Sequence, residues 1–459
     1  MIGVKKRPLG KVGRKEIIKF DSFILSDEEK AGSMRAKSSQ NCDCTDGKIS
    51  HGIALKPYKT ASGTELYIGA VSDVQMLFPL YASDALGNSV EDIFVLYQLD
   101  GKGYGRRYLD ENSAWNTPSE YLLETAGVYA LNPDGGVVSL LFNKSGCKYR
   151  NMEGFYISRG YRKSRGMACY CQNRVFVASG DREITYSDPA EPTEITKTEN
   201  DGGAILRPLD GDMIVELLAK EDCVYVFYRH SIVKIEVTGE PKGFRVRPLG
   251  YTGGEIYGKT AVVCGAWIVF LAADGIYRFD GEKAERICKW MQVQVSTENP
   301  TFGRGRYLSN ALISYTDEQG DLCTVAIEPE KKDGYFLAPL KGLTECNGRT
   351  FCVLMNKIMQ VDEENRTSIS VSCSFTSTEM DFGDKEKKTL KSVRLKGEGS
   401  VLLRVYCDTK TIDKELTFVN GEASFSPMLR GKKFSFGFTL GKNSCVEGLE
   451  AEVNFWDVK

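Results

Sequence analysis

A recurring pair of strand-like segments is the feature of this sequence that most constrains its fold. Each copy has a short apolar run, a turn with Gly or charged residues, and a second, alternating run. The clearest copies are RVFVASGDREITYSD (174–188), CVYVFYRHSIVKIEV (223–237) and WIVFLAADGIYRFDG (267–281). Alternation of period two predicts strands, and a turn signal such as Asp274-Gly275 between two such runs predicts a β-hairpin.

The spacing of the hairpins predicts how they assemble. Equivalent first-strand positions are Ile93, Tyr129, Val175, Val224, Ile268, Leu312 and Cys352. Successive positions lie 36, 46, 49, 44, 44 and 40 residues apart. A period of about 40–50 residues with about four strands per repeat is typical of propeller blades. We therefore predict an all-β chain with a β-propeller of six to eight blades, seven favoured, over residues 51–368.

The strands after residue 368 are longer and alternate more evenly, which predicts a C-terminal β-sandwich or jelly-roll over 369–459. In KKFSFGFTL, the side chains of Phe434, Phe436 and Phe438 fall on one face of a strand. We expect this row to be core rather than ligand surface. The lysine-rich run KEKKTLKSVRLK (385–396) is expected to be an edge strand that its lysines protect from further pairing.

Residues 1–50 are charged and have little strand signal, so we expect an N-terminal arm that feeds the first blade. The first 20 residues contain seven basic side chains against one acidic residue, Glu16. This composition fits either an arm that binds an acidic partner or nucleic acid, or a solvated terminus. The candidate partner-binding residues of the arm are Lys5, Lys6, Arg7, Lys11, Arg14 and Lys15.

A second basic segment lies at residues 144–165, where Tyr149, Phe155, Tyr156 and Tyr161 are interleaved with the charges. Basic and aromatic side chains together are typical of a surface that contacts phosphates or stacks bases. The alternative is a connection between blades, with its aromatics in the core and its charges in solvent. The candidate nucleic-acid or subunit contacts are Lys144, Lys148, Arg150, Arg159, Arg162, Lys163 and Arg165.

Nothing in the sequence predicts catalysis, a cofactor or a metal site. His51 and His230 are the only histidines, and no nucleophile–base–acid set surrounds either of them. Most of the 14 cysteines lie in apolar strand-like runs, which predicts reduced thiols in a cytosolic setting. Cys42/Cys44 and Cys169/Cys171 form Cys-x-Cys pairs without further ligands at zinc spacing. No apolar run reaches the ~20 residues of a membrane span, and we expect a soluble protein made in the cytoplasm.

Two stretches resemble a signature of bacteriophage and prophage structural proteins. The first is NRVFVASGDREITYSDPAEPTEI (173–195), with an Arg-hydrophobic-Phe strand and a Tyr-Ser-Asp-Pro turn. The second runs from HSIVKIEVTGE (230–240) through a Gly-Gly segment to the hairpin DGIYRFDG (274–281). The resemblance implies a virion component: a propeller-bearing tail nozzle or head–tail connector protein, akin to packaged-DNA stabilization proteins. It carries over no catalytic residues.

The function that the resemblance implies is assembly into an oligomeric ring around the DNA exit channel of a tailed phage. The expected partners are other tail or connector proteins, further copies of this chain and, transiently, packaged DNA. The expected location is the virion, after synthesis in the bacterial host cytoplasm. Two alternatives stay open: a propeller that binds glycans or proteins, and a propeller hydrolase with carboxylates that converge at the central funnel.

Overall fold

The computed structural model is an all-β protein, as the alternating pattern predicted. It describes residues 14–25, 31–44, 46–60, 63–68, 73–109, 114–158, 160, 161, 164–196, 203, 205, 206, 212–238, 240–346, 348–363 and 372–455. Across these ranges the single helical element is the 3₁₀ turn η2 (Pro241–Gly243). None of the described segments is a helix with the length and hydropathy needed to cross a membrane.

The chain divides into two compact units. Unit 1 consists of Met1–Ala54, Gly334–Ala338 and Glu364–Lys459, and unit 2 consists of Leu55–Asp333 and Pro339–Glu363. The N-terminal segment therefore belongs with the C-terminal segment, and the expectation of an arm that feeds the first blade is wrong for its described part. The physical reason is strand pairing, because β1 (Arg14–Phe20) is hydrogen-bonded along its whole length to β42 (Cys445–Phe455).

Unit 2 is built from antiparallel meanders that follow one another along the chain. The first two merge into one nine-stranded sheet through the pairing of Ser83 with Val137: β7 (Asp73–Ser83), β8 (Ser89–Leu99), β9 (Lys102–Leu109), β10 (Ala114–Trp115) and β11 (Ser119–Glu120), then β12 (Ala126–Leu131), β13 (Val137–Asn143), β14 (Gly146–Arg150) and β15 (Phe155–Ile157).

The next four sheets have four strands each, in chain order. They are β16 (Ala168–Cys171), β17 (Arg174–Ala178), β18 (Ile184–Tyr186) and β19 (Ile205–Leu206); β20 (Ile214–Lys220), β21 (Cys223–Tyr228), β22 (Ile232–Glu236) and β23 (Arg245–Leu249); β24 (Val262–Cys264), β25 (Trp267–Ala272), β26 (Gly275–Phe279) and β27 (Ala284–Ile287); and β28 (Phe302–Tyr307), β29 (Asn310–Thr316), β30 (Leu322–Glu328) and β31 (Asp333–Leu337). Of the last of these strands, β31, the residues from Gly334 onward are counted with unit 1.

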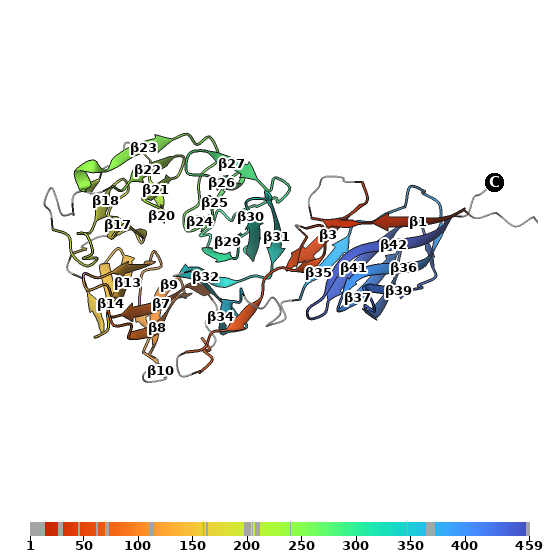
Figure 1. Cartoon of the computed structure of the whole chain (residues 1–459), viewed down its shortest axis with the longest axis horizontal. Coiled ribbons are helices and arrows are strands. Elements are labelled where there is room, and N and C mark those ends of the chain that lie inside the picture. The colour runs from red at the N-terminus through yellow and green to blue at the C-terminus, as the bar shows by residue number, and fades with distance from the viewer. Residues whose placement is uncertain are drawn as a thin grey trace, which may run out of the picture. The chain divides into compact units, whose positions relative to one another are not determined.

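The last sheet of unit 2 joins two segments that are distant in the sequence. It consists of β32 (Lys341–Cys346), β33 (Arg349–Leu354), β34 (Lys357–Val361) and β6 (Leu55–Pro57), with Leu55 opposite Val361 in the ladder. The strand that precedes the first sheet thus becomes the outer strand of the last one. Figure 1 shows the sheets of unit 2 one after another around a ring.

Apolar clusters between neighbouring sheets hold this ring together. Phe176 and Val226 share one cluster, and Phe227 and Phe270 share the next. Another cluster contains Phe78 of β7 and Phe351 of β33, so the first and last sheets also pack face to face. Burial of both faces explains why strands such as β17 and β26 have no exposed residue.

The predicted hairpins are present, but most of the positions taken as first strands of the repeat belong to second strands. The first-strand positions predicted from the repeat lie on the second strand of their sheet, on β8, β17, β21, β25, β29 and β33. Tyr129 is the exception because it lies on β12, the first strand of its meander. The pattern selects the second strand elsewhere because that strand is the most continuously apolar one.

Unit 1 contains two larger sheets and a short ladder. One sheet has the order β1-β42-β36-β39, with β40 also on β36; the other has the order β2-β3-β35-β41-β37-β38. The bounds not yet given are β2 (Ser22–Ile24), β3 (Ser33–Gln40), β4 (Cys42–Asp43), β5 (Ser50–His51), β35 (Ser374–Ser377), β36 (Lys388–Glu398), β37 (Ser400–Cys407), β38 (Lys410–Thr417), β39 (Glu422–Phe425), β40 (Leu429–Gly431) and β41 (Phe434–Leu440).

The core of unit 1 confirms one expectation and overturns another. Phe434, Phe436 and Phe438 are buried, so the Phe row of β41 is core. The predicted lysine-protected edge strand is wrong, because β36 lies inside its sheet between β42 and the β39/β40 pair. Its first residue, Lys388, is fully buried and donates from Nζ to the carbonyls of Asp381 at 2.6 Å and Lys432 at 2.9 Å.

Candidate functional site

The described lysines and arginines of the basic segment lie close together in sequence but take different acidic partners. Lys144 forms an ion pair with Glu124 at 2.7 Å. Arg150 is buried, and its Nε lies 3.2 Å from the carboxylate of Asp92. Arg165 pairs with Asp181. Lys148 is the exception, because its ammonium lies over the Tyr121 ring and not beside a carboxylate. Arg159, Arg162 and Lys163 lie outside the described residues.

The aromatic side chains of the segment are divided between core and surface. Tyr161 is buried against Phe142, with ring centroids 4.9 Å apart, and its hydroxyl donates to the carbonyl of Pro192. Phe155 lies under the guanidinium of Arg107 at 4.4 Å, whereas Tyr156 is exposed. The two described arginines of the segment therefore pair with carboxylates of the same chain, Arg150 with buried Asp92 and Arg165 with exposed Asp181.

The predicted N-terminal contact residues are only partly described. Lys5, Lys6, Arg7 and Lys11 lie outside the described residues. Arg14 and Lys15 belong to β1, where Arg14 pairs with Glu16 at 2.5 Å and Lys15 pairs with Glu452 of β42 at 3.1 Å. These two charges therefore support the strand ladder of unit 1.

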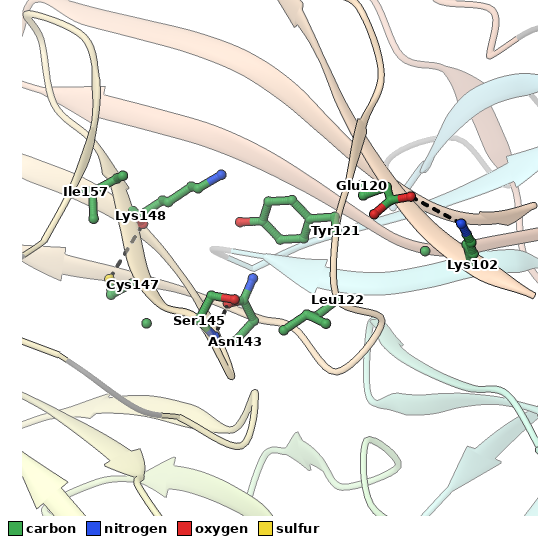
Figure 2. Close-up of a pocket in the computed structure, with 11 residues that line it drawn as sticks. Lys102, Glu120, Tyr121, Leu122, Asn143, Ser145, Cys147, Lys148 and Ile157 are labelled. Carbon is green, nitrogen blue, oxygen red and sulfur yellow. Dashed lines mark hydrogen bonds and ion pairs between the residues drawn. The ribbon is translucent and has the colours of Figure 1, made fainter.

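Lys148 lines a cavity of unit 2 that has a volume of about 550 Å³. The walls come from β9, from the segment that follows β11, from the turn between β13 and β14, and from β15. Figure 2 shows the side chains that surround it. The lining residues are Lys102, Gly103, Glu120, Tyr121, Leu122, Asn143, Ser145, Gly146, Cys147, Lys148 and Ile157.

One backbone contact fixes the position of the wall that carries Tyr121. The Tyr121 N–H donates to the carbonyl of Gly103 at 2.9 Å, and a Cβ at Gly103 would lie only 2.2 Å from the Tyr121 carbonyl oxygen. Only glycine at position 103 lets the segment after β11 lie this close to β9. The Tyr121 ring then packs against Phe94, with ring centroids 5.1 Å apart.

The charges around this cavity are unbalanced. Lys102 is 3.4 Å from Glu120, so these two charges offset each other. The Lys148 ammonium lies over the Tyr121 ring, 4.8 Å from its centroid, and no carboxylate among the described residues pairs with it. Desolvation, followed by repulsion from Arg107, lowers the pKa of Lys148.

A second group of charged residues lies on the axis of the ring of sheets. The first strands β7, β12, β16, β20, β28 and β32, with the segment before β24, surround a cavity of about 80 Å³. Buried Glu216 accepts hydrogen bonds there from the Lys259 backbone N–H at 2.5 Å and forms an ion pair with Arg304 at 3.1 Å. Lys259 as a whole is exposed to solvent. The protein that surrounds its ammonium nevertheless desolvates it, and this lowers the pKa of Lys259.

Sequence reasoning found Lys148 but missed both groups of partners. Tyr121 and Asn143 approach Lys148 through sheet pairing, and Glu216 meets Arg304 from a different sheet. A cluster of basic residues shows in composition, whereas side chains brought together from distant strands leave no local signal.

The residues that carry the phage-protein resemblance have a structural role. Arg174 donates to the Ser187 carbonyl at 2.9 Å, and its guanidinium lies 5.7 Å from the Tyr186 ring centroid. The Ser187 hydroxyl accepts from the Val175 N–H, and Asp188 accepts from the Thr196 N–H. The Arg-hydrophobic-Phe strand and the Tyr-Ser-Asp-Pro turn thus hold each other in place.

The histidines and thiols have simple surroundings. His51 contacts the Gly441 carbonyl at 2.9 Å, and exposed His230 contacts Asp212 at 2.9 Å. Desolvation opposes ionisation of Asp212, but hydrogen bonds from the Met213 backbone N–H and from the ring and backbone of His230 lower the pKa of this carboxyl. All 14 cysteines are free, and most are buried. The Sγ atoms of Cys42 and Cys44 are 3.6 Å apart. Within the described ranges, no group of His, Cys, Asp or Glu has the arrangement of a metal site.

Comparison with known proteins finds distant structural likeness. No protein-family model and no curated protein matches the sequence. The chain is similar to a fungal alcohol oxidase of the AA5 family in complex with copper, with 9% identity and a TM-score of 0.40, over 81% of this chain and 93% of that one. It is also similar to BamB from Moraxella catarrhalis, with 12% identity and a TM-score of 0.32, over 67% and 97% of the two chains. Both TM-scores are low, so fold and function must rest on the strands and side chains themselves.

Proposed function

We propose that unit 2 is a seven-bladed β-propeller and that unit 1 is a β-sandwich. The nine-stranded sheet counts as two blades joined by a single residue pair, and the five four-stranded sheets are the other blades. Pairing of β6 with β34 supports a closed ring, because it supplies the last blade with an outer strand from before the first blade. Closure leaves no blade without a neighbour on either face.

The function proposed for this chain is that of a virion structural protein in a tailed phage or prophage, acting as a tail nozzle or head–tail connector subunit. The observation that carries the proposal is the Arg174–Ser187 interlock, which accounts for the phage-protein signature as a scaffold feature. A signature made of buried, mutually bonded residues fits a protein that works by shape and assembly. No catalytic residue and no cofactor enters this proposal.

The size of the axial cavity of unit 2 bears on where DNA would pass. The cavity beside Glu216 has a volume of about 80 Å³, and a second cavity that shares Arg304 and Glu345 with it has about 490 Å³. Neither volume would hold a stretch of DNA duplex. A DNA channel would therefore have to form between copies of the chain, arranged as a closed ring with repeated, identical contacts. In this proposal, the exposed basic residues therefore contact neighbouring subunits rather than DNA at the axis of a single chain.

Electron microscopy of the purified full-length protein tests this proposal. Samples at high concentration, alone and mixed with candidate portal and tail proteins, should contain rings or stacked tubes with a central channel. The same preparation in high salt is the control, because contacts that depend on exposed charges weaken as the salt concentration rises. Monomers under every condition, with and without the candidate partners, would refute the assembly role.

A propeller that binds proteins or glycans is the second candidate, and the cavity at Lys148 is the observation that favours it. A glycan-binding sandwich would present an exposed aromatic platform. In the described part of unit 1, however, every aromatic side chain is buried or half-buried. Glycan-array binding by the isolated protein would revive that form of the candidate.

A further inference from the structure

The cavity beside Lys148 has the features of a binding site that the assembly role does not use. Three residues with polar side chains line it: Asn143 at the end of β13, Ser145 in the turn that follows, and Lys148 of β14. In Figure 2, Lys148 and the amide nitrogen of Asn143 both extend toward Tyr121. The side-chain oxygen Oδ1 of Asn143 already accepts a hydrogen bond from the Ser145 backbone N–H at 2.9 Å, which leaves the side-chain N–H₂ group as the donor on the cavity side.

The Tyr121 hydroxyl adds an unpaired polar group to the same wall. Its oxygen is buried and has no hydrogen-bond partner among the described residues. A buried hydroxyl without a partner is unfavourable by about 1–3 kcal/mol. This oxygen has almost no accessible surface, so the Lys148 ammonium beside it, and not the hydroxyl, is the group that a bound anion would contact.

The balance of charge decides the class of ligand. Lys102 and Glu120 offset each other, so Lys148 supplies one unopposed positive charge, aided by neutral donors. One cation with an amide matches a singly charged carboxylate better than a doubly charged phosphate, which is usually bound by arginine clusters or several backbone N–H groups. The anion therefore carries one negative charge.

The rest of the cavity is apolar. Leu122 and Ile157 line it and are exposed to solvent, Ile157 to 73%. The Tyr121 ring continues the same wall. Exposed aliphatic side chains beside an unpaired cation fit a ligand with an apolar body that covers them.

We propose that this cavity binds a carboxylate attached to an apolar body. Two sources have this chemistry: a polypeptide chain end whose last residue is apolar, and a free medium-chain carboxylic acid. The carboxylate accepts from Lys148 and Asn143, and the apolar body lies on Leu122 and Ile157. The inference is independent of the proposed assembly, because every residue that it uses belongs to unit 2 of a single chain.

Saturation-transfer difference NMR on the full-length protein tests the site with defined probes. N-acetyl-leucine stands for a chain end, octanoate stands for a free acid, and N-acetyl-leucinamide is the neutral counterpart. We expect saturation of the methyl groups of at least one carboxylate and none of the amide. A signal from N-acetyl-leucine alone assigns the chain end, and a signal from octanoate alone assigns the free acid. Equal signals from N-acetyl-leucine and its amide, or no carboxylate signal, would overturn the proposal.

Variants assign the signal to this cavity. Lys148→Gln should weaken carboxylate binding at least tenfold, and Ile157→Ser, at an exposed position that does not endanger folding, should weaken it several-fold. Lys283→Gln, on an exposed turn of unit 2 away from the cavity, is the matched control and should bind like the wild type. Carboxylate binding unchanged in both Lys148→Gln and Ile157→Ser would place the probe elsewhere and reject the site.

Discussion

The axial ion pair of unit 2 allows a quantitative test of how the ring is held at its centre. Glu216 is 6% exposed at its side chain, and its carboxylate lies 3.1 Å from the Arg304 guanidinium. The same carboxylate accepts the backbone N–H of Lys259 at 2.5 Å. Replacement of Glu216 by Ala removes both interactions and leaves the Arg304 charge without its partner.

The expected loss follows from the burial of the two partners. Removal of one member of a buried ion pair costs about 3–5 kcal/mol, because the remaining charge stays desolvated. Arg304 keeps 29% of its side chain exposed, so water can compensate part of that loss. We therefore expect Glu216→Ala to lower the free energy of unfolding by about 3 kcal/mol. At about 2 °C per kcal/mol for a large domain, the Tm of unit 2 should fall by about 6 °C.

Chemical unfolding followed by tryptophan fluorescence measures this change. Three of the four tryptophans, Trp115, Trp267 and Trp290, belong to unit 2 and report on it. Glu345→Ala is the matched control, because Glu345 lines the same cavity and its carboxylate has no hydrogen bond or ion pair among the described residues. That variant should change stability by less than about 0.5 kcal/mol. Equal losses in Glu216→Ala and Glu345→Ala would refute the role given to the axial pair.

Three further predictions concern the core, the signature turn and the thiols. Phe436→Ala should destabilise unit 1 by about 3–5 kcal/mol in thermal unfolding, because its ring is fully buried, whereas Thr439→Ala on the exposed side of the same strand should be near neutral. Arg174→Lys should lower stability by about 1–2 kcal/mol in urea unfolding, because lysine loses the directed hydrogen bond to Ser187; Arg182→Lys, exposed nearby, is its control. Burial raises the pKa of the Cys264, Cys288 and Cys352 thiols to about 12. Below pH ~8.5 the thiols are protonated in both the folded and the unfolded chain, so they do not change the free energy of unfolding. As the pH rises from ~8.5 toward 12, only the unfolded chain loses these protons, so the free energy of unfolding should fall. A flat profile over this window in urea titrations would contradict the prediction.

The hairpins could be predicted because their signal is local. In β25 and β26, the apolar run, the turn and the second run lie within 15 consecutive residues, so period and turn chemistry identify them without knowledge of the rest of the chain. The Phe row of β41 was predictable for the same reason. The pairing of β1 with β42 was not, because it joins residues more than 400 positions apart and depends on which strand edge is free.

The basic segment shows where charge patterns lose information. Seven basic side chains within 144–165 indicate positive charge, but Glu124, Asp92 and Asp181, which neutralise three of them, are supplied by other strands and turns. Lys388 illustrates the same limit in unit 1. A lysine at the start of a charged run is expected to be exposed to solvent. The ammonium of Lys388 is instead surrounded by backbone carbonyls of two different turns.

Both units depend on strands from the N-terminal part of the chain. Unit 1 takes β1, β2 and β3 from residues 14–40, and the last sheet of unit 2 takes β6 from residues 55–57. Neither set of pairings can form until β34 and β42 have been synthesised, so the first strands must wait for almost the whole chain. Contacts of such long sequence separation are slow to form, because the closure entropy of the intervening chain must be overcome first. An incomplete chain therefore cannot finish either unit, because β1 lacks its partner until β42 is present and β6 lacks its partner until β34 is present.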